Sequence, residues 1–136
     1  KTVMQSVNVL NALGYKISNS NLKNGLLNVV SNTGLQGRWQ IINESPKIIC
    51  DTAHNKEGLT YVMQQLQQET YNNLHIVFGV VNDKDLSLII ELLPKKATYY
   101  FCKPNIPRGL DALTLKEESE QFGLTGKTYS SVNKAE

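Results

Sequence analysis

The stretch IICDTAHN, residues 48–55, decides the fold. It is an apolar run that ends in an acid, two small residues, a histidine and an amide. A short apolar run of this kind fits a buried strand of a parallel sheet, and in open α/β sheets ligands bind at the carboxyl ends of the strands. We therefore expect Asp51, His54 and Asn55 to lie on a binding rim, in the turn between a strand and a helix.

The residues on the carboxyl side of this turn predict alternating helices and strands. In the segment 56–68, Leu59, Val62, Met63 and Leu66 have the i, i+3, i+4, i+7 spacing of an amphipathic helix. The same patterns predict helices at 57–69, 85–92 and 111–122, and strands at 74–80, 97–102 and 127–129. Strands that alternate with helices indicate parallel βαβ units, so the fold class is α/β.

Two further strands are expected just before the turn. The segments 38–43 and 46–50 have strand character and flank the turn residues 43–46, which include a proline. A hairpin from 38 to 50 would bring Arg38, at its start, close to Asp51, at its end. Arg38 and Asp51 are therefore candidate neighbours, although thirteen positions separate them in the sequence.

The N-terminal part of the chain predicts helices. A helix at 2–13 ends at Gly14, and a second helix is expected at 19–32. A linker near 33–37 then sets the boundary between residues 1–33, the helical tail of a preceding domain, and residues 34–136, an α/β domain. The chain begins without methionine, and the start of a further helix near its end is not completed. We therefore expect a piece of a longer protein, truncated at its C-terminus.

Composition excludes several functional classes. The 136 residues are enough for one core, with 40% hydrophobic and 19% charged residues, as in ordinary globular domains. The net charge of +2 and the scattered basic residues indicate no nucleic-acid partner. No stretch reaches the roughly 18 to 20 apolar residues that cross a bilayer, so no membrane role is expected. Cys50 and Cys102 lack a C-x-x-C spacing, which favours reduced thiols and a cytoplasmic location.

Six features, in this order along the chain, resemble those of one family. Gly37-Arg38, the proline-containing turn, the apolar strand and the D-x-A-H-N turn at 51–55 resemble the C-terminal domain of folylpolyglutamate synthase/dihydrofolate synthase, in the Mur ligase superfamily. Residues 82–85 resemble the family's D-K-D turn, and Pro107-Arg108 resembles its Pro-Arg element. The resemblance covers residues 30–132. It implies a Rossmann-like, mostly parallel sheet flanked by helices, with a short helical N-terminal appendage from the preceding domain.

The resemblance also implies a reaction. Family members are ATP-dependent, ADP-forming ligases that add L-glutamate to folates through an acyl phosphate, with Mg²⁺. The G-K-[ST] phosphate loop and the carboxylates for Mg²⁺ are missing from this sequence, and the family carries them in the preceding domain. This chain is then expected to supply one wall of the nucleotide and glutamate site, and to be inactive alone. The alternatives are another Mur superfamily ligase, such as a muramyl peptide ligase, and a non-catalytic nucleotide-binding α/β domain.

Arg38 and Asp51 each have a functional and a structural interpretation. The resemblance assigns Arg38 to the triphosphate or the adjacent sugar of ATP, which suits the rigid donor fork of a guanidinium. The alternative for Arg38 is a surface ion pair with Glu44 or Asp51. The resemblance assigns Asp51 to the ribose region, where a carboxylate accepts from hydroxyl groups. The alternative for Asp51 is a helix N-cap.

The remaining candidates also keep both interpretations. The resemblance assigns His54 of the D-x-A-H-N loop to the nucleotide or phosphate, and the alternative for His54 is a turn residue hydrogen-bonded to the backbone. Asn55 of the same loop is also assigned to ATP by the resemblance. By resemblance Lys84 and Asp85 face the cleft and bind substrate, or they form a solvated turn in which Asp85 caps a helix. Arg108 binds substrate or only anchors its loop. No residue of the chain is assigned a catalytic or metal-binding role.

Overall fold

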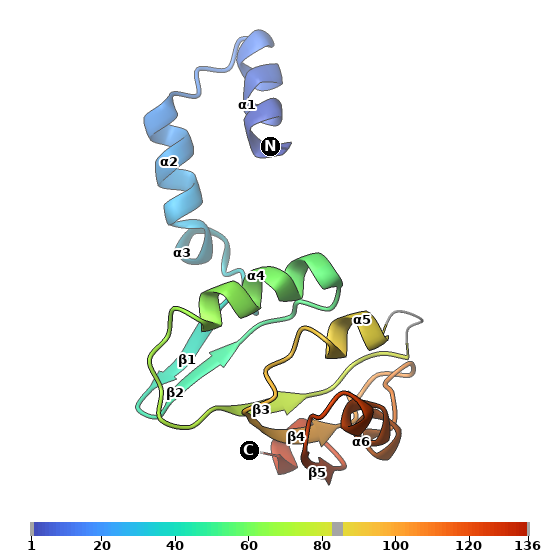
Figure 1. The fold of residues 1–136 in the computed structure, drawn as a ribbon. Coiled ribbons are helices and arrows are strands. Elements are labelled where there is room, and N and C mark those ends of the chain that lie inside the picture. The colour runs from blue at the N-terminus through green and yellow to red at the C-terminus, as the bar shows by residue number, and fades with distance from the viewer. Residues whose placement is uncertain (1, 83–85, 136) are drawn as a thin grey trace. The chain divides into compact units, whose positions relative to one another are not determined.

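The computed structural model describes residues 2–82 and 86–135 of the chain. The chain divides into two compact units, Lys1–Asp51 and Thr52–Glu136. Figure 1 labels their helices and strands. Each unit is described here by itself.

The first unit opens with three helices, α1 (Thr2–Ala12), α2 (Asn19–Leu27) and α3 (Val29–Thr33). The predicted helix at 2–13 is confirmed, but the single helix predicted at 19–32 is wrong, because the chain leaves helical geometry at Asn28 (φ −106°, ψ 21°). The Asn28 side-chain amide donates to the Asn24 carbonyl at 2.9 Å. Short amide side chains compete with the backbone in this way and so favour helix ends.

The second part of this unit is a hairpin. Strands β1 (Gln40–Glu44) and β2 (Lys47–Cys50) pair antiparallel, with Gln40 opposite Cys50. The predicted hairpin is confirmed. The expectation that residues 48–50 form a buried strand of a parallel sheet is wrong: β2 is antiparallel, and Ile48 is 46% exposed. The chain reverses directly at residues 45–46, and such a short connection joins only antiparallel strands.

The second unit alternates helices and strands. Its elements are α4 (Lys56–Leu66), β3 (His75–Phe78), α5 (Leu86–Ile90), β4 (Thr98–Cys102), α6 (Ala112–Gln121), β5 (Gly126–Tyr129) and the short 3₁₀ helix η1 (Val132–Lys134). The three strands form one parallel sheet in the order β3-β4-β5. The predicted α/β class, with a parallel sheet flanked by helices, is confirmed, and each predicted element from residue 57 to residue 129 has its counterpart.

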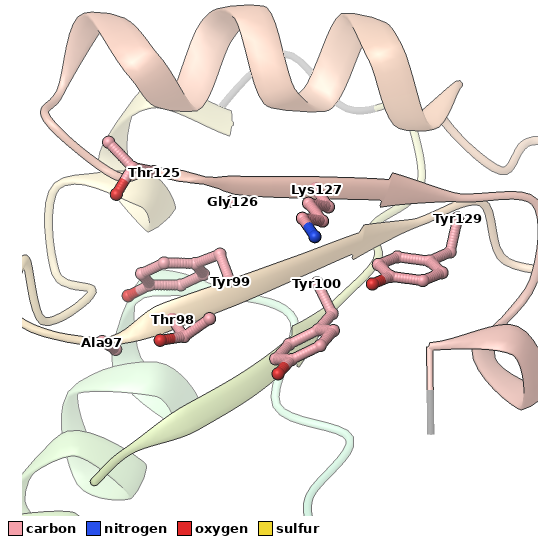
Figure 2. Close-up of a pocket in the computed structure, with 8 residues that line it drawn as sticks. All are labelled: Ala97, Thr98, Tyr99, Tyr100, Thr125, Gly126, Lys127 and Tyr129. Carbon is pink, nitrogen blue, oxygen red and sulfur yellow. The ribbon is translucent and has the colours of Figure 1, made fainter.

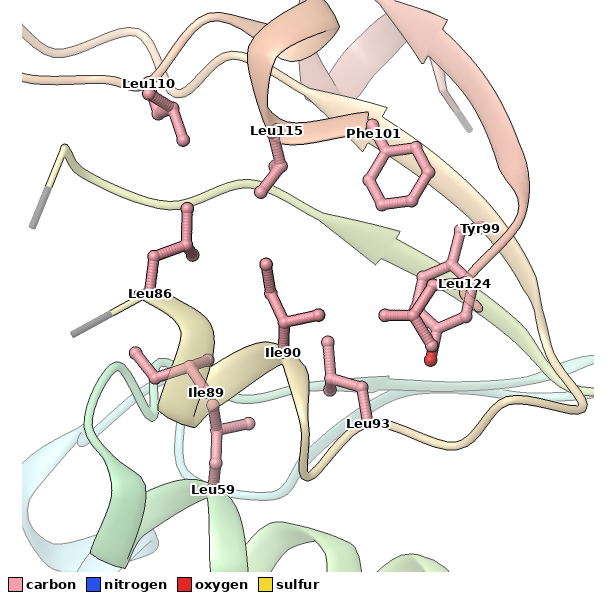
Figure 3. Close-up of a cluster of buried hydrophobic side chains, with 10 residues drawn as sticks. All are labelled: Leu59, Leu86, Ile89, Ile90, Leu93, Tyr99, Phe101, Leu110, Leu115 and Leu124. Atoms are coloured by element: carbon pink, nitrogen blue, oxygen red, sulfur yellow. The ribbon is translucent and has the colours of Figure 1, made fainter. Parts of the chain in front are cut away.

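The core of this unit joins the middle strand to the helices. Tyr99 and Phe101 of β4 are both fully buried, and their rings stack with centroids 5.6 Å apart. Figure 3 shows them beside side chains from α5 and α6, with Leu59 of α4 at the edge of the same cluster. Because β3 and β4 pair in parallel, the loops that follow them leave the sheet at the same edge. In sheets of this class, that edge is where ligands bind.

Candidate functional site

The hairpin holds Asp51 against the backbone next to Arg38. The Trp39 amide donates to Asp51 Oδ2 at 2.6 Å, and Trp39 lies in the left-handed region with φ 45°. Arg38 is exposed, and its Nη1 donates to the Gly37 carbonyl at 3.1 Å. The expectation that the hairpin brings Arg38 and Asp51 close together is therefore confirmed. Asp51 is not the N-cap of α4, because that cap is Asn55.

His54 and Asn55 occupy the predicted turn between a strand and a helix. The Asn55 side-chain oxygen accepts from the Gly58 amide at 2.8 Å, so it caps the N-terminus of α4. His54 is exposed, and its Nδ1 lies 3.0 Å from the Thr52 carbonyl. Both residues belong to the second unit, whereas Arg38 and Asp51 belong to the first. Their common binding rim stays a prediction.

A second cluster lies at the carboxyl ends of β3 and β4. The Asn82 amide donates to the Arg108 carbonyl at 2.8 Å, and the Leu110 amide donates to the Val80 carbonyl at 2.9 Å. Between these bonds, Val81 pairs with Gly109 in an antiparallel bridge. The structure therefore brings the Pro-Arg element to Asn82, the first residue of the predicted D-K-D turn. Lys84 and Asp85 lie outside the described residues.

The sequence prediction missed this pairing of the two loops. The sequence places residues 79–82 and 104–110 after two strands, but it contains no signal for which loop residues bond to each other. The usable signal was the glycine in each loop, Gly79 and Gly109, because glycines after strands often mark a close approach of two backbones. Gly79 belongs to no phosphate-loop pattern, and Gly109 together with Pro104 and Pro107 indicates only a rigid loop around Arg108.

A hollow of about 450 Å³ lies elsewhere on the sheet of the second unit. Figure 2 shows its lining, which comes from the first residues of β4 and β5, the residues just before them, and the side chains of Tyr100, Lys127 and Tyr129. His75, expected at the start of a strand, lies on β3 with its Nδ1 2.9 Å from the Tyr100 hydroxyl. The hollow is separate from the Arg108 loop, and ligands of parallel sheets bind at the other strand ends. We do not assign it to the predicted site.

Within residues 2–82 and 86–135, no three His, Cys, Asp or Glu side chains form a group that could hold a metal ion. Cys50 and Cys102 are both free thiols, and burial raises the pKa of Cys102. None of the described helices combines the length and apolar character needed to span a membrane.

Comparison with known proteins adds independent evidence. The family model "Mur ligase, glutamate ligase domain" matches residues 37–136. Dihydrofolate synthase/folylpolyglutamate synthase of Escherichia coli (strain K12) is 30% identical over 128 residues, which are 93% of this chain and 28% of that protein. The protein of the same name from Buchnera aphidicola subsp. Schizaphis graminum is 34% identical over 93 residues, 68% of this chain and 22% of the relative.

Solved structures agree with the sequence relatives. E. coli FolC in complex with DHPP and ADP has a TM-score of 0.75 and 28% identity, covering 98% of this chain and 31% of that chain. Folylpolyglutamate synthase of Mycobacterium tuberculosis complexed with ADP and AMPPCP has a TM-score of 0.68 and 28% identity, covering 74% and 24%. The chain thus spans less than a third of each of these relatives.

These matches extend over the parallel sheet and the hairpin alike. The chain is similar to the C-terminal domain of folylpolyglutamate synthases. The family model covers nearly all residues from the hairpin onward, including the D-x-A-H-N turn and the Arg108 loop. On this evidence, the chain belongs to the Mur ligase family and contains its glutamate ligase domain.

Proposed function

We propose that the chain is part of a folylpolyglutamate synthase, acting also as a dihydrofolate synthase, that adds L-glutamate to folates while converting ATP to ADP. The observation that carries this proposal is the similarity to dihydrofolate synthase/folylpolyglutamate synthase from E. coli over 93% of the chain. A solved relative with Mn, AMPPNP and L-glutamate bound supports a nucleotide, a divalent metal and glutamate as ligands of the parent. The name of that relative describes it as bifunctional.

In this proposal the hairpin contacts the nucleotide. Arg38 is exposed and has the donor fork that matches phosphate oxygens, so we assign it to the triphosphate or the adjacent sugar. Asp51 is assigned to the ribose. A carboxylate accepts at about four lone-pair sites, so the bond from Trp39 is compatible with a further bond from a ribose hydroxyl.

The turn before α4 contributes two more groups. His54 is exposed and is assigned to the nucleotide or its phosphates. The Asn55 oxygen caps α4, and the side-chain NH₂ group is the part that we assign to the ligand. Arg108 is assigned to substrate, at the edge formed by the ends of β3 and β4. Lys84 and Asp85, outside the described residues, are assigned to substrate by resemblance.

The rest of the site is assigned to the preceding domain. ATP would supply the phosphoryl group that activates the folate carboxyl group for attack by glutamate. The described residues hold no carboxylate cluster for Mg²⁺, so we assign its ligands to the preceding domain, together with the phosphate loop. Residues 1–33 would be the tail of that domain and 34–136 the glutamate ligase domain. A cytoplasmic location fits the two free thiols.

Two alternative functions are less well supported. A muramyl peptide ligase would share the family model, but the relatives described above are folate enzymes. A non-catalytic nucleotide-binding domain would share only the fold with the folate enzymes described above.

One assay separates the three. The full-length parent is mixed with ATP, L-glutamate and a folate, and ADP release is followed; the 136-residue chain and a muramyl peptide acceptor are the controls. We expect ADP release that depends on folate and glutamate from the parent only. Release with the muramyl acceptor alone, or none with any acceptor, would contradict the proposal.

A further inference from the structure

The loops after β3 and β4 form one clamped unit. Backbone bonds run in both directions between them: Asn82 donates to Arg108, and Leu110 donates to Val80. These two bonds make up the antiparallel bridge between Val81 and Gly109. They tie the backbone of Arg108 to the end of β3.

Two glycines lie where backbone leaves no room for a side chain. A Cβ atom on Gly79 would lie 2.6 Å from the carbonyl oxygen of Cys102, the last residue of β4, and a Cβ atom on Gly109 would overlap the Pro104 carbonyl oxygen of its own loop. Both obstacles are backbone atoms, which cannot rotate away as a flexible side chain can. Gly79 is therefore required where the end of β3 approaches the end of β4, and Gly109 is required for the fold of the loop that carries Arg108.

The loop that carries Arg108 is also fixed internally. The Ile106 amide donates to the Pro104 carbonyl at 2.8 Å, and the Gly109 amide donates to the Ile106 carbonyl at 2.9 Å. Leu110, only 9% exposed, anchors the end of the loop in the core (Figure 3). Arg108 itself is exposed. A backbone fixed by these bonds thus carries an exposed Arg108 side chain.

We propose that this clamp positions Arg108 to bind an oxyanion of the substrates, and that Gly79 and Gly109 are positioning residues that act through Arg108. The proposal rests on the proposed function, and it names the chemistry that the Arg108 loop recognises. A guanidinium binds carboxylate and phosphate oxygens in the same two-point geometry. The oxyanion belongs either to L-glutamate or to ATP. A loop that is already ordered loses less conformational entropy when Arg108 binds the oxyanion. The function of the clamp is to keep the loop ordered in this way.

The first test uses Arg108 itself. In the full-length parent, we expect Arg108→Ala to raise KM for one of glutamate or ATP by about tenfold to a hundredfold, as for loss of a charged hydrogen bond. The substrate whose KM rises identifies the source of the oxyanion. Lys103→Ala, which removes an exposed cation from the same loop, is the matched control. Arg108→Lys should recover only part of the loss, because an ammonium lacks the fork.

The second test asks whether the glycine acts through Arg108. Gly109→Ala should raise the same KM, but it should add nothing when Arg108 is already alanine. Full additivity would overturn the positioning role, and Arg108→Ala with both KM values within about twofold of the parent would overturn the oxyanion contact. If Gly109→Ala does not fold, Gly79→Ala replaces it in the same cycle, and the Arg108→Ala result stands independently.

The two proposals fail in different ways. A parent that releases no ADP with folate and glutamate contradicts the proposed function. In that case calorimetric titration of the Arg108→Ala and Lys103→Ala variants with ADP and with L-glutamate still tests the oxyanion contact. Equal affinities of both variants for both ligands would overturn it.

Discussion

At the scale of single residues, Asp51 stabilises an unusual backbone at the predicted nucleotide wall. Trp39 has φ 45°, and a non-glycine residue in this region costs roughly 1 to 3 kcal/mol. The Asp51 carboxylate accepts from the Trp39 amide at 2.6 Å, and hydrogen bonds to charged groups contribute about 1.5 to 3 kcal/mol. The two magnitudes are similar, so Asp51 offsets the strain beside Arg38.

Arg38→Ala in the parent should weaken nucleotide binding without weakening the fold. The side chain is exposed, and loss of a charged contact to phosphate should cost roughly 1.5 to 3 kcal/mol of interaction with ATP. KM for ATP and the urea midpoint are the two measurements. An unchanged KM together with a lower midpoint would make Arg38 a structural ion-pair partner instead. Lys47→Ala, which removes an exposed cation from the same hairpin, is the control for the loss of a surface charge.

At the scale of elements, helix α4 depends on its cap. Asn55→Ala should lower the stability of the chain by about 1 kcal/mol, because the Gly58 amide loses its acceptor. Asn55→Asp should keep that stability, because Asp caps as well as Asn, yet it removes the NH₂ donor assigned to the ligand. Thermal unfolding of the chain and KM for ATP of the parent separate the two roles. Equal KM values for Asn55→Asp and the parent would leave Asn55 as a cap only.

Strand β4 couples stability to alkaline pH. Tyr99 is fully buried, its hydroxyl donates to the Pro94 carbonyl at 2.7 Å, and burial raises its pKa. The folded state then keeps the proton at pH values where the unfolded chain, with an ordinary tyrosine pKa of about 10, releases it. The contribution of Tyr99 to the free energy of unfolding is therefore constant below about pH 10. It falls as the pH rises further, because the unfolded chain then releases the proton that the folded state keeps.

Tyr99→Phe removes this coupling. We expect the variant to be less stable than the chain by about 1 kcal/mol at pH 7, because it lacks the bond to Pro94. The gap should narrow above about pH 10, since Phe does not ionise. Cys102, whose pKa burial also raises, is present in both proteins and cancels in the comparison. Urea unfolding at a series of pH values measures the gap; a constant gap would contradict the prediction.

Local sequence patterns predicted most elements well. The spacing of Leu59, Val62, Met63 and Leu66 predicted α4, because one apolar face needs that period whatever it packs against. The break at Asn28 was missed, and residues 48–50, correctly predicted as part of a hairpin, were wrongly expected to be buried. The break depends on competition between the Asn28 side chain and the helical backbone. Apolar periodicity does not report such competition.

At the scale of the whole molecule, the two units differ in how they are stabilised. In the described residues 2–51, only Gly37 is buried, and helices α1, α2 and α3 have no buried residue. Leu13 and Leu27 are 72% and 71% exposed. The second unit, by contrast, has a core that reaches from α4 to α6. Helices this short are marginal in water unless packing supports them.

Amide hydrogen exchange should show this difference directly. In the 136-residue chain, we expect amides of α1–α3 to exchange within seconds to minutes, and amides of β4 to be protected for far longer. In the full-length parent, where we propose that residues 1–33 pack on the preceding domain, α1–α3 should become protected. Equal exchange of α1–α3 in the chain and the parent would contradict that domain assignment.

The candidate site was predictable only in part. Arg38 and Asp51 were paired correctly because a hairpin fixes which residues meet. Asn55 was named as a ligand but is also a cap, since the same polar atoms serve helix ends and binding sites alike. The Arg108 loop was found by resemblance, whereas its bonds to Val80 and Asn82 are long-range and left no pattern in either segment.

The bridge between Val81 and Gly109 also limits how long the loops after β3 and β4 can be in homologous or engineered proteins. Because two backbone hydrogen bonds pair the loops at fixed positions, one inserted or deleted residue between a strand and its paired position would shift the pairing and displace Arg108. The exposed connection at 70–73, between α4 and β3, has no such partner bonds among the described residues. Fused tags, inserted domains or a circularly permuted terminus therefore belong at 70–73.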